Sequence, residues 1–263
     1  MTPMPMTQVP LLAVRGLTKR YGERVGCLDV GFDLWSGEVL GLVGESGSGK
    51  TSVLQCLAGR LEATAGCADF FQRDGTIVDI LRLPEAPRRR LARTDWAMVQ
   101  QNPRDGLRMG VTAGANVGER LMAVGERHYG RIRREALDWL GQVEIPQDRI
   151  DDLPGTFSGG MLQRLQIARC LVTRPRLVFM DEPTGALDVS VQARLLDLLR
   201  GLVADLGLSA IVVTHDLAVA RLLAHRLLVM KDGEVIESGL TDQVLDDPQH
   251  PYTQLLVSSV LQP

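Results

Sequence analysis

The chain has 263 residues, of which 45% are hydrophobic, and a formal net charge of −3. This length fits one large α/β domain, or one domain with an inserted lobe, and the composition supports a sizeable core. A weakly acidic chain has no overall basic field, and only 4% of its residues are aromatic, so we expect no nucleic-acid partner.

No apolar run reaches the roughly 18 residues that a membrane-spanning helix needs, so we expect no direct membrane insertion. Residues 1–10 carry three prolines and no positive charge, which predicts a flexible N-terminal arm rather than a signal peptide. We therefore expect a cytoplasmic protein. The four cysteines form no CxxC pair and are expected to be reduced core residues: Cys27, Cys56, Cys67 and Cys170.

Strand signals begin at residues 11–34, where alternation interrupted at Tyr21 and Gly22 predicts two antiparallel strands around a turn. Further on, apolar runs predict buried strands at residues 38–43, 177–180 and 210–213. The segment between the last two has apolar residues at helical spacing. Strand–helix–strand alternation with buried strands predicts a parallel sheet covered by helices.

Residues 11–263 are expected to form a single domain. Within it, apolar residues at helical spacing predict a helical lobe at about residues 102–175, inserted between two strands of the sheet. Asp232 and Gly233 predict a hairpin turn, and a short helical tail is expected at about residues 240–263. Residues 84–87 are expected to be an irregular connection, because two of them are prolines.

An arginine cluster follows this connection, within a short helical stretch: Arg88, Arg89, Arg90 and Arg93. No aromatic residues are interleaved with it, so a solvated helix face is favoured over a nucleic-acid patch.

A glycine-rich segment at residues 44–51 satisfies the pattern G-x-x-x-x-G-K-[ST] between a predicted strand and a predicted helix. Its glycines allow successive N–H groups to point at phosphates, and the helix start adds a positive dipole end. Lys50 is expected to reach the β- and γ-phosphates, and the Thr51 hydroxyl to bind Mg²⁺. The expected nucleotide-binding residues of this loop are Gly44, Glu45, Ser46, Gly47, Ser48, Gly49, Lys50, Thr51 and Ser52.

Two carboxylates follow the predicted strand at residues 177–180. Asp181 at the strand end is expected beside the Mg²⁺ ion. Glu182, one residue further, is expected to polarise the attacking water, a role typically worth ~10²–10⁴-fold in rate. Taken alone, a strand ending in solvated acids is common, but the phosphate-binding loop favours the catalytic interpretation.

A second predicted anion site lies at Ser158-Gly159-Gly160, where a helix begins. Serine is a favourable N-cap, and the two glycines expose backbone N–H donors.

Together these motifs resemble the ABC (ATP-binding cassette) ATPases over almost the whole chain. The resemblance identifies the loop at 44–51 as Walker A and residues 177–181 as Walker B. It implies that Glu182 is the catalytic base and His215 the switch histidine. It implies that Gln101 is the Q-loop glutamine, which binds Mg²⁺ together with Thr51 and Asp181. It also implies that Asp188 lies in the D-loop, that Tyr21 stacks on adenine, and that the signature consists of Ser158, Gly159 and Gly160. Gln100 is an adjacent competitor for the Q-loop position.

The family resemblance implies a P-loop NTPase fold with a RecA-like core, an antiparallel β lobe and an inserted helical lobe. It also implies ATP and Mg²⁺ as cofactors, with ATP hydrolysis involving Lys50 and Gln101 beside the catalytic base. Two chains, identical or related, are expected to join head to tail, so that the signature of one covers the nucleotide of the other. The usual signature reads Leu-Ser-Gly-Gly-Gln, whereas Phe157 and Met161 occupy its first and last positions here.

Three segments, at residues 102–109, 118–125 and 149–154, resemble the ABC subunit associated with the bacterial carbon–phosphorus lyase of phosphonate breakdown. This implies docking on the soluble lyase core complex. Arg104 and Arg108 offer charge-assisted contacts to such a partner.

Two alternatives are an oligopeptide- or dipeptide-transporter ATPase docking on a permease, and an ATP-dependent clamp with little turnover. Residues 247–253 are shared with those transporter ATPases and do not discriminate. Glu182 and His215 disfavour the clamp, because a clamp needs no positioned base.

Overall fold

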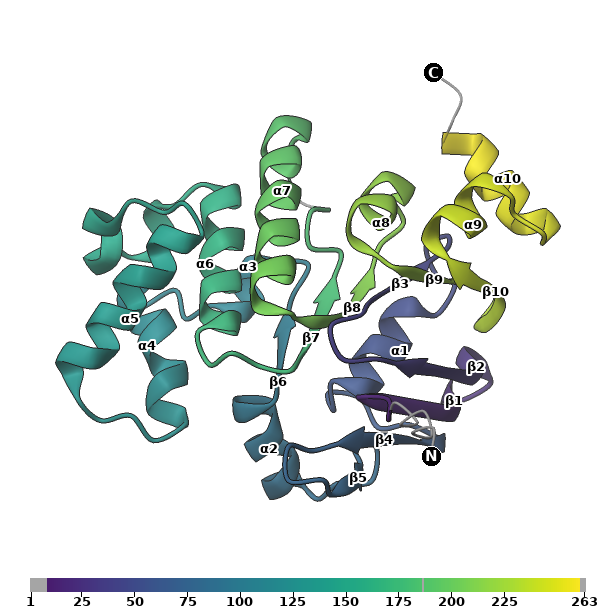
Figure 1. The fold of residues 1–263 in the computed structure, drawn as a ribbon, viewed down its shortest axis with the longest axis horizontal. Helices are drawn as coiled ribbons and strands as arrows, with labels where there is room; N and C mark the ends of the chain where they lie inside the picture. Colours follow the sequence, from purple (N-terminus) through teal and green to yellow (C-terminus); the bar gives the residue numbers. More distant parts are fainter. Residues whose placement is uncertain (1–8, 186, 261–263) are drawn as a thin grey trace, which may run out of the picture.

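The computed structural model of the chain describes residues 9–185 and 187–260. Most of the expected N-terminal arm and the last three residues of the expected tail therefore lie outside the described residues. Figure 1 shows a central sheet, a helical lobe to one side and a smaller antiparallel sheet below.

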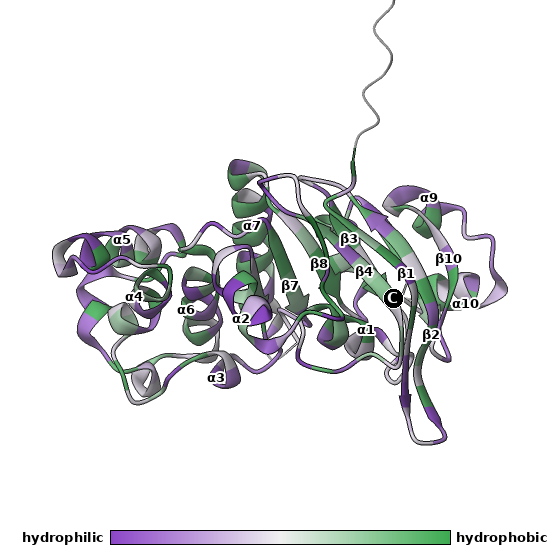
Figure 2. Cartoon of the chain, turned by 90° about the horizontal axis from the view of Figure 1, so that it is seen from below, coloured by the Kyte–Doolittle hydropathy of each residue, from purple (hydrophilic) through white to green (hydrophobic). Residues whose placement is uncertain are grey.

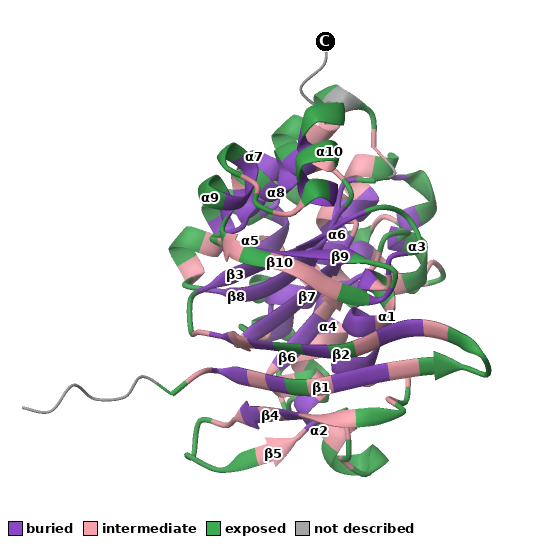
Figure 3. Ribbon diagram, turned by 90° about the vertical axis from the view of Figure 1, so that its right-hand side faces the viewer, coloured by how far each residue is buried: buried purple, intermediate pink, exposed green. Residues whose placement is uncertain are grey.

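The central sheet has six strands in the order β10-β9-β3-β8-β7-β6. Its strands are β3 (Val39–Val43), β6 (Trp96–Val99), β7 (Leu177–Asp181), β8 (Ser209–Val213), β9 (Arg226–Lys231) and β10 (Glu234–Leu240). Pairing is parallel except between β9 and β10. Every residue of β3, β7 and β8 is buried, as Figure 3 shows, which confirms the predicted buried parallel strands.

Alternate residues of these strands face two separate cores. In β7, Val178 and Met180 face a core shared with the helices, whereas Leu177 and Phe179 face a core shared with the small sheet. Figure 2 shows the hydrophobic strands between more polar outer helices. The sheet is therefore covered on both faces, as its continuous apolar strands predict.

The small sheet is antiparallel, in the order β2-β1-β4-β5. It consists of β1 (Leu12–Tyr21), β2 (Arg24–Leu34), β4 (Ala65–Phe71) and β5 (Ile77–Asp79). The hairpin predicted around Tyr21 and Gly22 is confirmed by the pairing of Tyr21 with Arg24. The strands β4, β5 and β6 are additions that the sequence pattern did not reveal.

The helices between β6 and β7 form the lobe at the left of Figure 1. They are α3 (Pro103–Gly106), α4 (Ala113–Ala123), α5 (Tyr129–Gln142), the 3₁₀ turns η1 (Gln147–Asp151) and η2 (Pro154–Thr156), and α6 (Gly159–Leu171). Because β6 and β7 are parallel neighbours, the lobe is an insertion between two strands of one sheet, as expected. Residues 102–175 remain our proposed bounds for it.

The expectation of an irregular connection at residues 84–87 is wrong in part. Helix α2 (Glu85–Thr94) already begins at Glu85, and Pro87 lies in its first turn. Proline is tolerated there because the first N–H groups of a helix have no partner within it.

The remaining helices are α1 (Lys50–Leu57), α7 (Val189–Leu206), α8 (Leu217–Leu223), α9 (Thr241–Asp246) and α10 (Pro251–Val260). The predicted hairpin turn is confirmed between β9 and β10, where Asp232 and Gly233 both have positive φ. Within residues 9–185 and 187–260, the structure contains no helix whose length and hydropathy suit a membrane span.

Replacing Phe179 with alanine tests the core that β7 shares with the small sheet. Phe179 is fully buried and packs edge-on against Trp96, with ring centroids 6.5 Å apart. The cavity left behind should lower the free energy of unfolding by about 3–5 kcal/mol, measured by urea denaturation. The exposed Ile77→Ala control should change it by less than about 0.5 kcal/mol. Equal effects of the two substitutions would contradict this packing.

Candidate functional site

The glycine-rich loop leaves β3 at Gly44 and enters α1 at Lys50. Gly44 has φ +143°, and a Cβ there would lie 2.2 Å from the carbonyl oxygen of Met230. Gly49 has φ +101°, and a Cβ there would lie 2.2 Å from the carbonyl oxygen of Gly26. Both positions therefore require glycine, because neighbouring backbone approaches the loop from two sides.

Lys50 is 5% exposed, and its ammonium group is folded back over this loop. The Nζ donates to the carbonyl oxygens of Gly44 (2.8 Å) and Glu45 (2.7 Å) and to Ser48 Oγ (3.2 Å). Burial lowers the pKa of Lys50, and the nearby carboxylates of Glu182, Asp181 and Glu45 oppose that shift. The ammonium is thus held where phosphate oxygens can replace the loop acceptors.

Asp181 at the end of β7 lies beside Thr51 at the start of α1. The Thr51 hydroxyl donates to Asp181 Oδ1 over 3.3 Å. Burial raises the pKa of Asp181, and the hydrogen bonds from Thr51 and Gln55 oppose that rise. A hydroxyl and a carboxylate side by side fit a hard cation such as Mg²⁺. Gln101, the third expected ligand, lines a different cavity from the one that Thr51 lines.

Glu182 and His215 form a close pair at the same edge of the sheet. Nδ1 of His215 lies 2.7 Å from each carboxylate oxygen of Glu182. The Glu182 N–H donates to the carbonyl oxygen of Val213 over 2.9 Å, and its φ is +46°. Left-handed backbone at a residue other than glycine is strained and clusters at functional sites. His215 therefore holds the carboxylate of Glu182, and the positive φ of Glu182 constrains its backbone as well.

A cavity of about 450 Å³ opens beside the loop, within the size range of small-molecule sites. The Tyr21 ring lies over Gly26, since a Cβ there would be 2.6 Å from Tyr21 Cε2. The Tyr21 hydroxyl is 3.2 Å from Ser52 Oγ. The cavity is lined by Tyr21, Arg24, Val25, Gly26, Gly47, Gly49, Thr51 and Ser52. Arg24 is a lining residue that the sequence did not single out.

Ser158 caps helix α6, as expected, and its Oγ accepts from the Met161 N–H over 3.3 Å. Gly160 packs against α7, where a Cβ would lie 2.5 Å from Val191 Cγ1. Gly159 lines a second cavity of about 190 Å³ together with Gln101 and other residues. Gly159 of the signature thus borders the cavity that Gln101 lines, and no signature residue lines the cavity beside the P-loop of the same chain.

Arg149 connects both unusual signature residues. Its guanidinium lies 4.5 Å from the centroid of the Phe157 ring, and Nη1 is 3.8 Å from Met161 Sδ. An ion pair with Asp152 at 2.6 Å fixes the arginine in place. The departures from the usual signature therefore share one cationic neighbour, which orients the start of α6.

Gln166 in α6 connects the signature helix to the Q-loop backbone, a role that sequence reasoning missed. Its Oε1 accepts from the Gln100 N–H over 2.7 Å, and its Nε2 donates to the Gln100 carbonyl over 3.2 Å. Gln166 is fully buried. Its separation of 66 residues from Gln100 left no local signal.

Asp188, expected in the D-loop, is the exposed N-cap of α7. Its Oδ1 accepts from the Val191 N–H (3.0 Å) and the Ser190 hydroxyl (2.9 Å). These hydrogen bonds lower the pKa of Asp188, the one from Val191 contributing most.

A third cavity, of about 360 Å³, lies between α2 and the helical lobe. Six of its lining residues are arginines: Arg60, Arg89, Arg93, Arg108, Arg120 and Arg169. Two of them, Arg89 and Arg93, are exposed on α2, which confirms the expected solvated helix face, and the same face forms one wall of this cavity.

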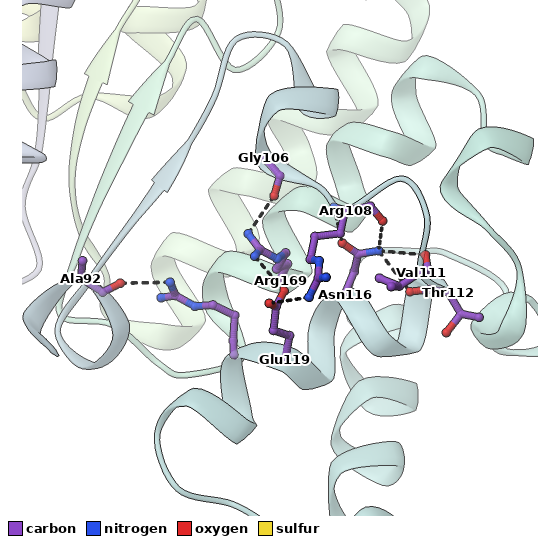
Figure 4. Close-up of polar contacts among 9 residues, drawn as sticks. Ala92, Gly106, Arg108, Val111, Thr112, Asn116, Glu119 and Arg169 are labelled. Carbon is purple, nitrogen blue, oxygen red and sulfur yellow. Dashed lines mark hydrogen bonds and ion pairs between the residues drawn. The ribbon is translucent and has the colours of Figure 1, made fainter. Parts of the chain in front are cut away.

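Figure 4 shows how the lobe side of this cavity is organised. Glu119 lies between Arg108 (3.0 Å) and Arg169 (3.2 Å). Burial raises the pKa of Glu119, but its contacts with the two arginines hold that pKa below its ordinary value. The fully buried Asn116 accepts from the Arg108 N–H over 2.8 Å and donates to the Val111 carbonyl over 3.2 Å.

The family described as "ABC transporter" matches residues 27–185. The chain is 66% identical over 253 residues to an Escherichia coli (strain K12) protein provisionally named phosphonates utilization ATP-binding protein PhnK, covering 96% of this chain and 98% of that protein. It is 40% identical to a provisionally named peptide import ATP-binding protein of Brucella ovis, covering 98% of this chain and 81% of that protein.

Among solved structures, the fold resembles the dimeric ATP-binding cassette MJ0796 in a post-hydrolysis state bound to ADP and Pi. The TM-score is 0.77 at 28% identity, covering 88% of this chain and 98% of that one. It also resembles CbiO1 of Clostridium perfringens, part of the ABC transporter complex CbiONQ. There the TM-score is 0.77 at 26% identity, covering 90% and 91% of the two chains. The chain therefore belongs to the ABC transporter family, and it is an ATP-hydrolysing ATP-binding cassette with the P-loop NTPase fold.

Proposed function

We propose that this chain is a cytoplasmic, Mg²⁺-dependent ATPase that docks on a soluble carbon–phosphorus lyase core complex and supports phosphonate catabolism. The observation that carries the proposal is the difference in similarity: 66% identity to the phosphonates utilization protein against 40% to the peptide import protein. Both relatives align with nearly the whole of this chain, so the difference does not come from partial coverage.

In this proposal ATP lies in the cavity at Tyr21, with its phosphates on the N–H groups of the loop at residues 44–51. Lys50 exchanges its loop acceptors for β- and γ-phosphate oxygens. Thr51 and Asp181 hold Mg²⁺, which supplies charge neutralisation of the phosphates, and Gln101 joins them after a movement of the Q-loop. The hydrogen bond between Thr51 and Asp181 supports the first two assignments.

Glu182 is the proposed base that accepts a proton from the attacking water. The contact of His215 Nδ1 with both of its oxygens, at 2.7 Å, keeps the carboxylate at the sheet edge beside Lys50 and Asp181. This arrangement disfavours a clamp that closes on ATP without turnover.

Two chains form the proposed working unit, either a homodimer or a pair with a related ABC subunit. Gly159 lines a cavity with Gln101, and the P-loop lines another, so the two phosphate-binding helix starts of one chain serve different spaces. The anion that Ser158 faces is then the nucleotide of the second chain. The dimeric state of the similar MJ0796 cassette supports this arrangement.

The arginine-lined cavity is the proposed docking surface for the lyase core complex. Its lining combines six arginines with one acidic residue, Asp105, and it borders the Q-loop segment at residues 105–108. Such a surface fits a polar, acidic protein surface, because guanidinium groups form charge-assisted hydrogen bonds with carboxylates.

Replacing Glu182 with glutamine should abolish ATP hydrolysis while ATP binding persists. The amide keeps the side-chain shape but does not accept a proton, so turnover should fall by at least ~10²-fold. Phosphate release and nucleotide titration measure the two properties separately. Turnover within about twofold of wild type would exclude Glu182 as the base.

Mixing two inactive chains tests the shared site. Lys50→Ala should weaken ATP binding, and Ser158→Arg should block the signature. In a heterodimer of the two, one composite site carries both defects and the other carries neither. The mixture should therefore regain phosphate release above either variant alone. Heterodimers that form without any recovery would contradict a site built from two chains.

Co-expression with carbon–phosphorus lyase core subunits, followed by size-exclusion chromatography with and without ATP, tests the partner. Wild type should co-elute with the core, and Arg93→Ala/Arg108→Ala should lose at least tenfold in affinity. Arg15→Ala is the control, because Arg15, like Arg108, is exposed and paired with a carboxylate, Asp33, but lies on the small sheet.

Equal binding by the control and the double variant would remove the arginine-lined cavity from the interface. Failure of wild type to co-elute, together with recovery of a permease from detergent-solubilised membranes, would favour the transporter alternative.

A further inference from the structure

The C-terminal helix α10 reaches the phosphate-binding loop through one side chain. The backbone N–H of Glu45, the second residue of the loop, donates to the hydroxyl oxygen of Tyr252 over 3.0 Å. The two residues are 207 positions apart in the sequence. Tyr252 is 7% exposed, so the acceptor side of this partly buried hydrogen bond lies inside the protein. The same peptide segment carries the Glu45 carbonyl that accepts from Lys50.

Tyr252 is itself held from two directions. Nζ of Lys231, at the end of β9, lies 5.1 Å from the centroid of the tyrosine ring. The turn that leads into α10 is fixed by Glu237 of β10, whose two carboxylate oxygens accept from the N–H groups of Gln249 (2.8 Å) and His250 (3.0 Å). The hydroxyl is therefore presented to the loop by two strands of the central sheet.

We infer that Tyr252 is a positioning residue of the phosphate-binding loop, through which the C-terminal segment presets the loop for nucleotide. The inference rests on the proposed role of that loop in holding ATP. Tyr252 touches neither Lys50 nor Thr51 by hydrogen bond in the described residues; it fixes the Glu45 peptide, and that peptide orients the loop entering at Gly44. Ordering the loop before ATP arrives lowers the entropic cost of binding.

The test is an ATP titration of phosphate release by the full chain carrying Tyr252→Phe. This change removes the hydroxyl and keeps the ring beside Lys231. Loss of one hydrogen bond should raise KM for ATP by about two- to tenfold, with kcat within twofold and the melting temperature nearly unchanged. Hydrogen exchange at the Glu45 amide should accelerate in parallel. Tyr129→Phe makes the same chemical change on the exposed helical lobe and should leave all of these values at wild type.

Glu237→Gln provides a second, independent perturbation. It weakens the carboxylate that fixes the start of α10, so it should raise KM in the same direction without touching the loop. An unchanged KM in Tyr252→Phe, or a fall in kcat alone, would overturn the inference. The proposed nucleotide role of the loop is tested separately by Lys50→Ala: if that variant also binds ATP normally, the loop assignment fails and this inference fails with it.

Discussion

Parallel pairing brings the carboxyl ends of β3, β8 and β7 to one edge of the central sheet, and the proposed nucleotide-binding and catalytic residues of the core follow those ends. Val213 of β8 pairs with Leu42 on one side and with Asp181 on the other. The phosphate-binding loop follows Leu42 closely, and the acidic pair Asp181 and Glu182 begins at Asp181. Both therefore start next to Val213. A register slip of one residue in β7 would turn Asp181 to the opposite face of the sheet and break its hydrogen bond with Thr51.

The helical lobe is joined to this edge by a short polar path. Gln166 binds the backbone of Gln100, and Nη1 of Arg169, one helical turn further along α6, donates to the carbonyl oxygen of Gly106 over 2.7 Å. Both contacts are made to the Q-loop segment that runs beside the arginine-lined cavity. A partner bound in that cavity would thus act on the same backbone that Gln101 belongs to, and on the helix that carries Ser158. In our proposal this is how docking and nucleotide closure are coupled.

Local sequence was sufficient for features whose physical cause is local. The loop at residues 44–51, the buried strand before Asp181 and the N-cap at Ser158 each depend on a few adjacent residues, and the structure contains all three. Contacts between distant segments were not predictable in this way. The hydrogen bond between Tyr252 and Glu45 joins residues 207 positions apart, and no periodic pattern in the sequence predicts it. The short strands β4 and β5 were missed because their residues lack clean alternation, and their strand character comes from pairing with neighbours.

In our proposal, ATP hydrolysis requires a P-loop from one chain and a signature from another. The most direct measurement is phosphate release per chain with Mg²⁺ and saturating ATP across a dilution series, with mass measured by light scattering at each concentration. A site built from two chains predicts that the activity per chain falls as the dimer dissociates. Constant activity per chain at concentrations where the protein is monomeric would contradict it.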